Sequence, residues 1–253
     1  MDITFKTYLI VCPLVFLAGL VDSIAGGGGL ISLPAYLFAG LPAHNAVATN
    51  KFSSSVGTAV STARLCYNNH PKHYHALPAV ILAFIGSHIG SRLSLLLPDS
   101  AFKIILCIIL PAVAFYVLKE KNLDKASEVE IPLSKQIITL SVSSFIIGAY
   151  DGFYGPGTGT FLILVYTTFA HMTLMESATT TKLANLTSNI SALVVFLMEG
   201  LVYIKLGLVA SLFSILGHYL GAGMVLKNGS KIVRAIILTV ISLLFVKIIL
   251  EFV

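Results

Sequence analysis

Ten apolar runs, separated by short polar stretches, constrain this chain more than any other feature of its sequence. Charged residues make up only 11% of the chain, against about 25% of a soluble globular domain, so a water-soluble fold would lack the polar groups to cover its surface. The runs must face lipid, which predicts an all-α integral membrane protein. They lie near residues 6–25, 28–41, 45–67, 76–97, 101–118, 136–154, 157–170, 176–200, 205–227 and 231–252.

Two of these runs, 28–41 and 157–170, are too short to cross a bilayer as straight helices. About 14 residues span roughly 21 Å, whereas the hydrocarbon core is roughly 30 Å thick. We therefore expect broken half-helices there. The sequence leaves open whether they cross the membrane fully.

The two halves of the chain resemble each other in three blocks that keep the same order. "FLAGLVDSIAGGGG", from Phe16, aligns with "FIIGAYDGFYGPGT", from Phe145, and "ATNKFSSSVGT" and "IGSHIGSRL" align with "TTTKLANLTSN" and "LGHYLGAGM". An internal duplication explains all three, with a first transmembrane repeat over 1–118, a cytoplasmic linker over 119–135 and a second repeat over 136–253. The matched residues are Gly19 with Gly148, Asp22 with Asp151, Gly26 with Gly155, Gly28 with Gly157, Thr49 with Thr180, Lys51 with Lys182, Ser54 with Asn185, Gly86 with Gly217 and Gly90 with Gly221.

The topology follows from the number of segments in each repeat. Five crossings, an odd number, make the two repeats inverted and put eight loop charges, including those of the linker, on one side, against three on the other. The richer side is expected to be cytoplasmic, which leaves both termini outside. If the short segments only dip into the membrane, each repeat has four crossings, the repeats are parallel and the charge bias is weaker. We prefer the inverted arrangement.

The glycine-rich stretches before the two short segments are candidate ligand-lining loops. Unwound backbone is tolerated at membrane depth only where it lines a cavity or is buried in protein, and a helix that starts there offers free N–H groups to an anion. Close helix packing is the alternative explanation. The candidate residues are Gly26, Gly27, Gly28 and Gly29 in the first half, and Gly157 and Thr158 in the second.

Lys51 and Lys182 occupy equivalent places in the two repeats, inside predicted spans. A lysine in a membrane is costly and usually paired or functional, although both lie close enough to a segment end to reach the headgroups instead. A polar stripe on the same helices favours a ligand-binding role. We therefore include Thr49, Asn50 and Ser54 with Lys51, and Thr180, Thr181 and Asn185 with Lys182, as candidate substrate-binding residues.

Asp22 and Asp151 are the matching acidic pair beside the glycine breaks. They could titrate for proton coupling, cap the broken helices or neutralise the lysines. We favour a structural role, because a carboxylate beside such a break satisfies exposed backbone N–H groups.

Enzyme signatures are absent from the sequence, so we predict no enzymatic activity and no cofactor. "GPGTG" lacks the Lys-Ser/Thr that a P-loop requires, and His70, His73 and His75 match no closed metal site, so no metal is expected. Interleaved basic and aromatic residues are also missing, which excludes nucleic acid as a partner. The expected partners are a small anion, a coupling proton in one version, and the lipid bilayer; the oligomeric state stays open.

The motifs "GLVDSIAGGGGLISLP" and "GLPAHNAVATNK", repeated more loosely as "GAYDGFYGPGTGTF" and "ATTTKLANLTSN", resemble the sulfite/organosulfonate exporter family (TauE/SafE, also called TSUP or DUF81) over nearly the whole chain. The resemblance implies a permease of the bacterial or archaeal cell (cytoplasmic) membrane for sulfite, thiosulfate or organosulfonates. The expected function is secondary transport of such anions by alternating access, with or without proton coupling. An anion channel, or a permease for another small anion such as a carboxylate, is the alternative. Pro156 replaces the glycine found at Gly27, and so removes one N–H donor from the second loop.

Overall fold

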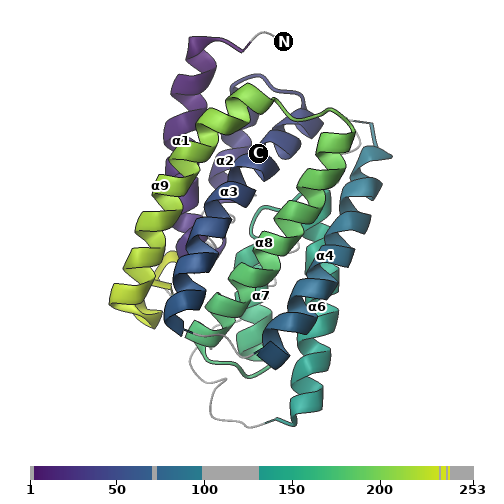
Figure 1. Ribbon diagram of the computed structural model, residues 1–253, viewed down its shortest axis with the longest axis vertical. Coiled ribbons are helices and arrows are strands. Elements are labelled where there is room, and N and C mark those ends of the chain that lie inside the picture. Colours follow the sequence, from purple (N-terminus) through teal and green to yellow (C-terminus); the bar gives the residue numbers. More distant parts are fainter. Residues whose placement is uncertain (1–2, 70–72, 99–130, 234, 238, 240–253) are drawn as a thin grey trace, which may run out of the picture.

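A computed structural model of the chain describes residues 3–69, 73–98, 131–233, 235–237 and 239 (Figure 1). Within these residues the fold is entirely helical, as the apolar runs predict. The predicted span 101–118 lies outside the described residues, as do most of the span 231–252 and of the linker 119–135. The helices are α1 (Phe5–Ala25), α2 (Gly29–Phe38), α3 (Ala43–Asn69), α4 (His73–Leu95), α6 (Leu133–Phe153), α7 (Thr158–Thr168), α8 (Leu174–Met198) and α9 (Ile204–Asn228).

The helix lengths fall into two classes. Among the described residues, four segments are long and apolar enough to cross a membrane, namely Phe5–Ala25, Leu77–Leu95, Leu174–Met198 and Ile204–Asn228. The two helices that follow the glycine breaks are much shorter, since α2 has 10 residues and α7 has 11. At 1.5 Å per residue each covers only about 15–17 Å. The prediction of two half-length helices is therefore confirmed.

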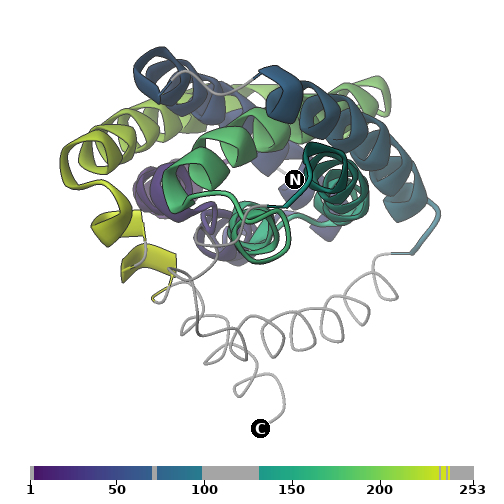
Figure 2. The same cartoon turned by 90° about the horizontal axis from the view of Figure 1, so that it is seen from below.

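The two halves of the chain are interlocked rather than side by side. α1 packs against α9, and the equivalent helix of the second half, α6, packs against α4 (Figures 1 and 2). α3 packs on α9 just as α8 packs on α4, and α3 and α8 contact each other. The first helix of each half thus has a helix of the other half as its main neighbour, and the pattern is the same in both directions.

Equivalent glycines allow the same close approach in both halves. A methyl group added to Gly86 on α4 would overlap the carbonyl oxygen of Phe145 on α6. One added to Gly217 on α9 would overlap the carbonyl oxygen of Phe16 on α1. Small residues that let backbones meet are typical of membrane helix pairs, and here they occur at positions that the internal repeat matches.

The equivalent helices run in opposite directions. In Figure 1, α1 starts at the end of the molecule where the N-terminus lies, whereas α6 starts at the opposite end. α3 and α8 are likewise antiparallel. This arrangement is compatible with the inverted repeats that the odd number of segments predicts.

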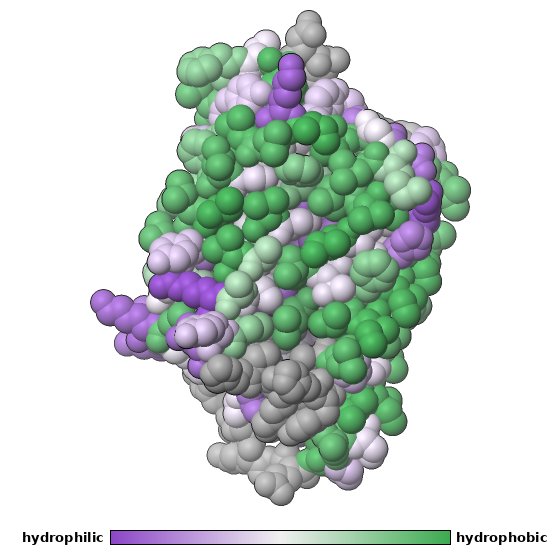
Figure 3. Space-filling view, in the orientation of Figure 1, coloured by the Kyte–Doolittle hydropathy of each residue, from purple (hydrophilic) through white to green (hydrophobic). Residues whose placement is uncertain are grey.

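Apolar side chains cover the outside of the protein, and many polar side chains are buried beside an apolar core. Ile138, Val142 and Ile146 on α6 are exposed, as are Leu208 and Leu212 on α9, and apolar side chains cover most of the face in Figure 3. The buried polar set includes Thr49, Asn50, Lys51, Thr58, Thr180, Thr181, Lys182, Asn185, Ser188 and Asn189. An apolar exterior around buried polar groups suits lipid as the surrounding solvent.

Candidate functional site

The first glycine break is held together by the carboxylate of Asp22. α1 ends at Ala25 because Gly26 adopts a left-handed conformation with φ of 77°, and the Gly26 N–H donates to the Asp22 carbonyl oxygen at 2.7 Å. The Gly28 N–H donates to Asp22 Oδ1 at 3.3 Å, at the start of α2. The side chain therefore caps the start of α2, six residues further along the chain.

The four glycines serve different purposes. A methyl group at Gly26 would overlap the Cα of Gly159 at the start of α7, so the two broken regions cross there. Gly28 and Gly29, in contrast, line a small pocket. A methyl group at Gly28 would overlap the Ala18 carbonyl oxygen, so close packing applies to Gly26 and to Gly28. Ligand lining stays a prediction for Gly28 and Gly29.

The second break satisfies its own backbone groups. Gly155 and Gly157 have φ of 100° and 84°, and α7 begins at Thr158. The Thr158 hydroxyl donates to the Gly155 carbonyl oxygen at 2.7 Å, and the Tyr150 hydroxyl donates to that of Pro156 at 2.7 Å. These carbonyl groups are therefore already occupied.

The two equivalent lysines form ion pairs that cross between the halves. Lys51 Nζ lies 2.7 Å from Asp151 Oδ2, and Lys182 Nζ lies 3.2 Å from Asp22 Oδ2. Both lysine side chains are buried, at 3% and 1% exposure, so neither extends to the membrane surface as the snorkelling alternative requires. Each lysine meets the aspartate of the opposite half.

Further polar side chains surround the Lys51–Asp151 pair. The Lys51 ammonium donates to Asn189 Oδ1 at 2.8 Å, and the Ser188 hydroxyl donates to Asp151 Oδ2 at 2.6 Å. Asn189 donates in turn to Asn185 Oδ1 at 3.3 Å. This pair is therefore enclosed by the polar face of α8.

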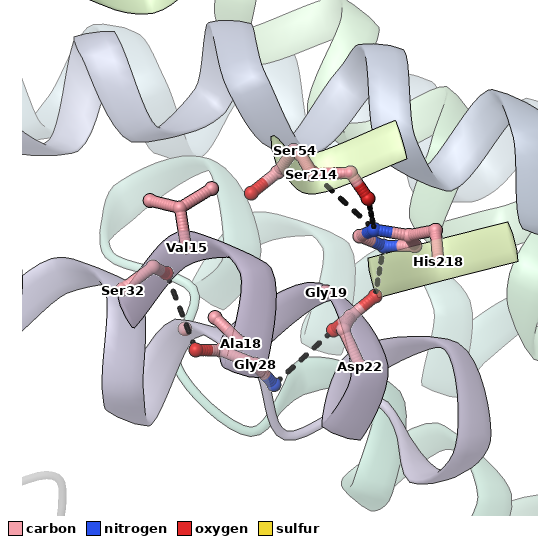
Figure 4. Close-up of a pocket in the computed structure, with 10 residues that line it drawn as sticks. Val15, Ala18, Gly19, Asp22, Gly28, Ser32, Ser54, Ser214 and His218 are labelled. Carbon is pink, nitrogen blue, oxygen red and sulfur yellow. Dashed lines mark hydrogen bonds and ion pairs between the residues drawn. The ribbon is translucent and has the colours of Figure 1, made fainter. Parts of the chain in front are cut away.

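A pocket is lined by Asp22, the acidic partner of the other ion pair (Figure 4). The centre of a water molecule can occupy about 10 Å³ of it, which is room for about one water. Polar atoms from four helices face this space, and an anion larger than water would need the pocket to widen. It is lined by Val15, Ala18, Gly19, Asp22, Gly28, Gly29, Ser32, Ser54, Ser214 and His218.

His218 is the residue of this cluster that the sequence analysis missed. It is buried on α9, with Nε2 3.2 Å from Asp22 Oδ2 and Nδ1 2.9 Å from the Ser214 carbonyl oxygen. The aligned blocks place it opposite Ser87. A histidine that replaces a small residue inside an aligned membrane span was the available signal, but a search for matched pairs passes over it.

The remaining candidate residues of α3 and α8 are placed by the following contacts. The Thr49 hydroxyl accepts a hydrogen bond from the Tyr203 N–H at 3.1 Å, which ties α3 to the start of α9. Asn50 accepts from the Ser54 hydroxyl at 3.4 Å. Thr180 is buried, and Thr181 Oγ1 is buried with no hydrogen-bond partner among the described residues. The side chains of His70, His73 and His75 lie outside the described set.

The arrangement combines two ammonium groups and two carboxylates in the protein interior, next to two broken helices. A buried ion pair is stable only while both partners are present. A small anion that reaches either lysine can take the place of a carboxylate, and a proton can neutralise one. The cluster can therefore respond to both kinds of ligand.

Comparisons with known proteins give one family model and several membrane transporter relatives. The model of the family described as sulfite exporter TauE/SafE matches residues 11–248. The chain is 33% identical to a probable membrane transporter protein, ORF9, of Sinorhizobium, over 94% of this chain and 91% of the relative. It is 34% identical to a probable membrane transporter protein of Haemophilus influenzae (94% and 92% covered) and 30% identical to YfcA of Escherichia coli, also a probable membrane transporter protein (96% and 93%). No solved structure matches the chain significantly.

Proposed function

The chain belongs to the TauE/SafE family of membrane transporters, and on this premise we propose that it carries small sulfur-containing anions, such as sulfite, thiosulfate or organosulfonates, by alternating access. Its place is the cytoplasmic membrane of a bacterium or archaeon. The distribution of loop charges supports a cytoplasmic linker with both termini outside.

The pair of buried lysines at equivalent positions is the observation that carries this proposal. Each ammonium group costs about 2.5–3.5 kcal/mol to place at the bilayer centre, and a chain that needed only packing would have no reason to keep two. Lys51 and Lys182 are held at the interior by Asp151 and Asp22. Positive groups in such a place suit an oxyanion better than a cation or a neutral solute.

Exchange of partners supplies a route from anion binding to movement. Both ion pairs join one half of the chain to the other. An anion that pairs with Lys182 would compete with Asp22 and weaken one of the two links. Because breaking a buried pair without replacement costs about 3–5 kcal/mol, the halves stay joined until an anion supplies the replacement charge. Substrate binding then favours their rearrangement.

A channel is the main alternative mechanism, and a small carboxylate is the main alternative substrate. The short helices α2 and α7, which meet at Gly26 and Gly159, support a gated site of the kind found between broken helices in secondary transporters. A channel would conduct without saturation. Saturable exchange therefore distinguishes the two mechanisms.

Uptake into proteoliposomes tests the proposal. Radiolabelled sulfite, thiosulfate and taurine are offered alongside acetate, and saturable uptake of at least one sulfur anion is expected. Lys51→Ala and Lys182→Ala should each lower it at least tenfold, corresponding to about 1.4 kcal/mol of lost binding. Lys205→Ala, a change at an exposed lysine of α9, is the matched control and should transport normally. Unchanged uptake in both interior variants would overturn the site, and uptake of acetate alone would replace the substrate class.

A further inference from the structure

His218 occupies a position where hydrogen-bonding geometry calls for an additional proton. Its Nδ1 lies 2.9 Å from the carbonyl oxygen of Ser214, which only accepts, and 3.3 Å from the Ser214 hydroxyl. The shorter contact places hydrogen on Nδ1. In a neutral imidazole Nε2 is then an acceptor. Yet Nε2 lies 3.2 Å from Asp22 Oδ2, and an ionised carboxylate also only accepts. A hydrogen bond between these two atoms therefore requires a proton on one of them.

Two cations can compete for the same carboxylate. Asp22 on α1 faces Lys182 of α8 and His218 of α9, with both Nζ and Nε2 3.2 Å from Oδ2. α3 contributes Thr58, whose hydroxyl lies 3.4 Å from Nε2. Among the described residues, Asp22, Lys182 and His218 are in direct contact at this point, and Lys51 of α3 lies near enough to Asp22 for the two charges to interact. When His218 loses its proton, the charges of Lys182 and Asp22 still balance each other.

The equivalent point in the other half lacks such a group. Ser87 stands where the repeat alignment places His218, and its hydroxyl donates to the Ser188 carbonyl oxygen at 2.6 Å. A small side chain is therefore enough to fill the space at this position. Asp151 is only 2% exposed, whereas Asp22 is 14% exposed and lines the pocket. The titratable His218 therefore lies at the ion pair that borders the pocket, where there is room for a water.

We propose that His218 and Asp22 form a proton-binding site that takes up and releases one proton in each transport cycle, and so couples anion movement to a pH gradient. In the loaded state Nε2–H bonds to Asp22 Oδ2 and ties α9 to α1. On release the proton passes to water in the pocket, leaving a neutral imidazole with hydrogen on Nδ1. The Nε2–Oδ2 bond is then lost. The coupling role rests on the proposed transport function, whereas the proton site itself does not.

The proton site can be tested without any substrate. Protein labelled with 15N-histidine is placed in lipid nanodiscs, its NMR spectrum is followed from pH 5 to pH 9, and the His218 signals are assigned by their loss in His218→Gln. We expect Nε2 of His218 to change from protonated to deprotonated within this range while Nδ1 stays protonated. A ring that keeps one protonation state throughout would overturn the site.

The coupling role is tested with a gradient of one pH unit across proteoliposomes that contain radiolabelled thiosulfate or sulfite. One coupled proton can drive up to about a tenfold change in steady-state accumulation, because one pH unit corresponds to 1.36 kcal/mol. The wild type should approach that ratio, and His218→Gln should fall to about one. His88→Gln, which removes an exposed histidine of α4, should behave like the wild type.

The outcomes separate the two proposals. A full pH response in His218→Gln, or none in the wild type, overturns the coupling role and leaves transport intact. If the wild type carries no sulfur anion at all, the proposed substrate class fails, and the NMR titration still decides on the proton site.

Discussion

The two ion pairs that join the halves of this protein are equivalent in sequence but not in surroundings. Lys51–Asp151 is enclosed by Ser188 and Asn189 of α8, with both partners almost completely buried. Lys182–Asp22 borders a pocket and includes His218. In this arrangement of the helices one pair is thus enclosed, and the other borders a pocket with room for about one water. Equivalent positions in the two halves therefore differ in their burial and in the groups around them.

Removing one carboxylate at a time should give the largest difference between the two pairs. Asp151→Ala leaves the Lys51 charge buried without a counterion, which should cost about 3–5 kcal/mol of unfolding free energy. Asp22→Ala should cost less, about 1–3 kcal/mol, because the Lys182 ammonium also donates to the backbone carbonyl of residue 22. Steric trapping in bicelles measures both values. Equal losses would contradict the distinction between an enclosed pair and a pair that borders a pocket.

A double replacement separates stability from transport at the enclosed pair. Lys51→Met combined with Asp151→Leu removes both charges, so most of the stability lost in Asp151→Ala should return. Anion uptake should stay at least tenfold below the wild type, since the ammonium is gone. A double variant that transports normally would reduce Lys51 to a purely structural residue.

The next largest difference is expected in the loss of stability when alanine replaces a glycine in each of the two breaks. In Gly26→Ala the new methyl group overlaps the Gly159 backbone, and overpacking of about 1–3 kcal/mol adds to about 1–2 kcal/mol for a left-handed alanine. Gly157 has a similar φ of 84°, but a methyl group there meets the Phe161 ring at 3.1 Å, so Gly157→Ala should lose only the backbone share. Thermal unfolding in detergent compares the two variants. A larger loss in Gly157→Ala would mean that the two breaks do not cross at Gly26.

Pro156→Gly should have the smallest effect and shows which break meets the anion. It restores the N–H that the second break lacks, and the more flexible unfolded chain should lower stability by about 0.4–1 kcal/mol. The pocket is lined by Gly28 and Gly29, not by Pro156. We therefore expect the apparent affinity for the transported anion to stay within about twofold in uptake assays. A gain of tenfold or more, about 1.4 kcal/mol, would place the second break in contact with the anion.

Much of the fold could be read from the sequence because lipid makes the apolar pattern decisive. The runs near 6–25 and 205–227 became α1 and α9, and those after the glycine stretches became α2 and α7. Their lengths followed from the absence of charge and from the glycines that interrupt them. The internal repeat also identified Gly86 and Gly217, whose close contacts fix the helix pairs.

The pairing of charges could not be read in the same way. The repeat matches Lys51 with Lys182 and Asp22 with Asp151, but it gives no choice between partners in the same half and partners in the other. That choice depends on how α3 and α8 lie against α6 and α1, which is a property of tertiary packing. His218 was missed for a related reason. The internal repeat points to residues that match between the halves, and His218 is aligned with a serine, Ser87.

The exchange of partners between halves also imposes an order on biosynthesis. Lys51 leaves the ribosome 100 residues before Asp151, which at about 5–20 residues per second is a delay of roughly 5–20 s. During this time the nascent first half holds an ammonium and a carboxylate in the membrane without their final counterions. Insertion of the second half is therefore the step that neutralises the first, and the halves can complete their interiors only together.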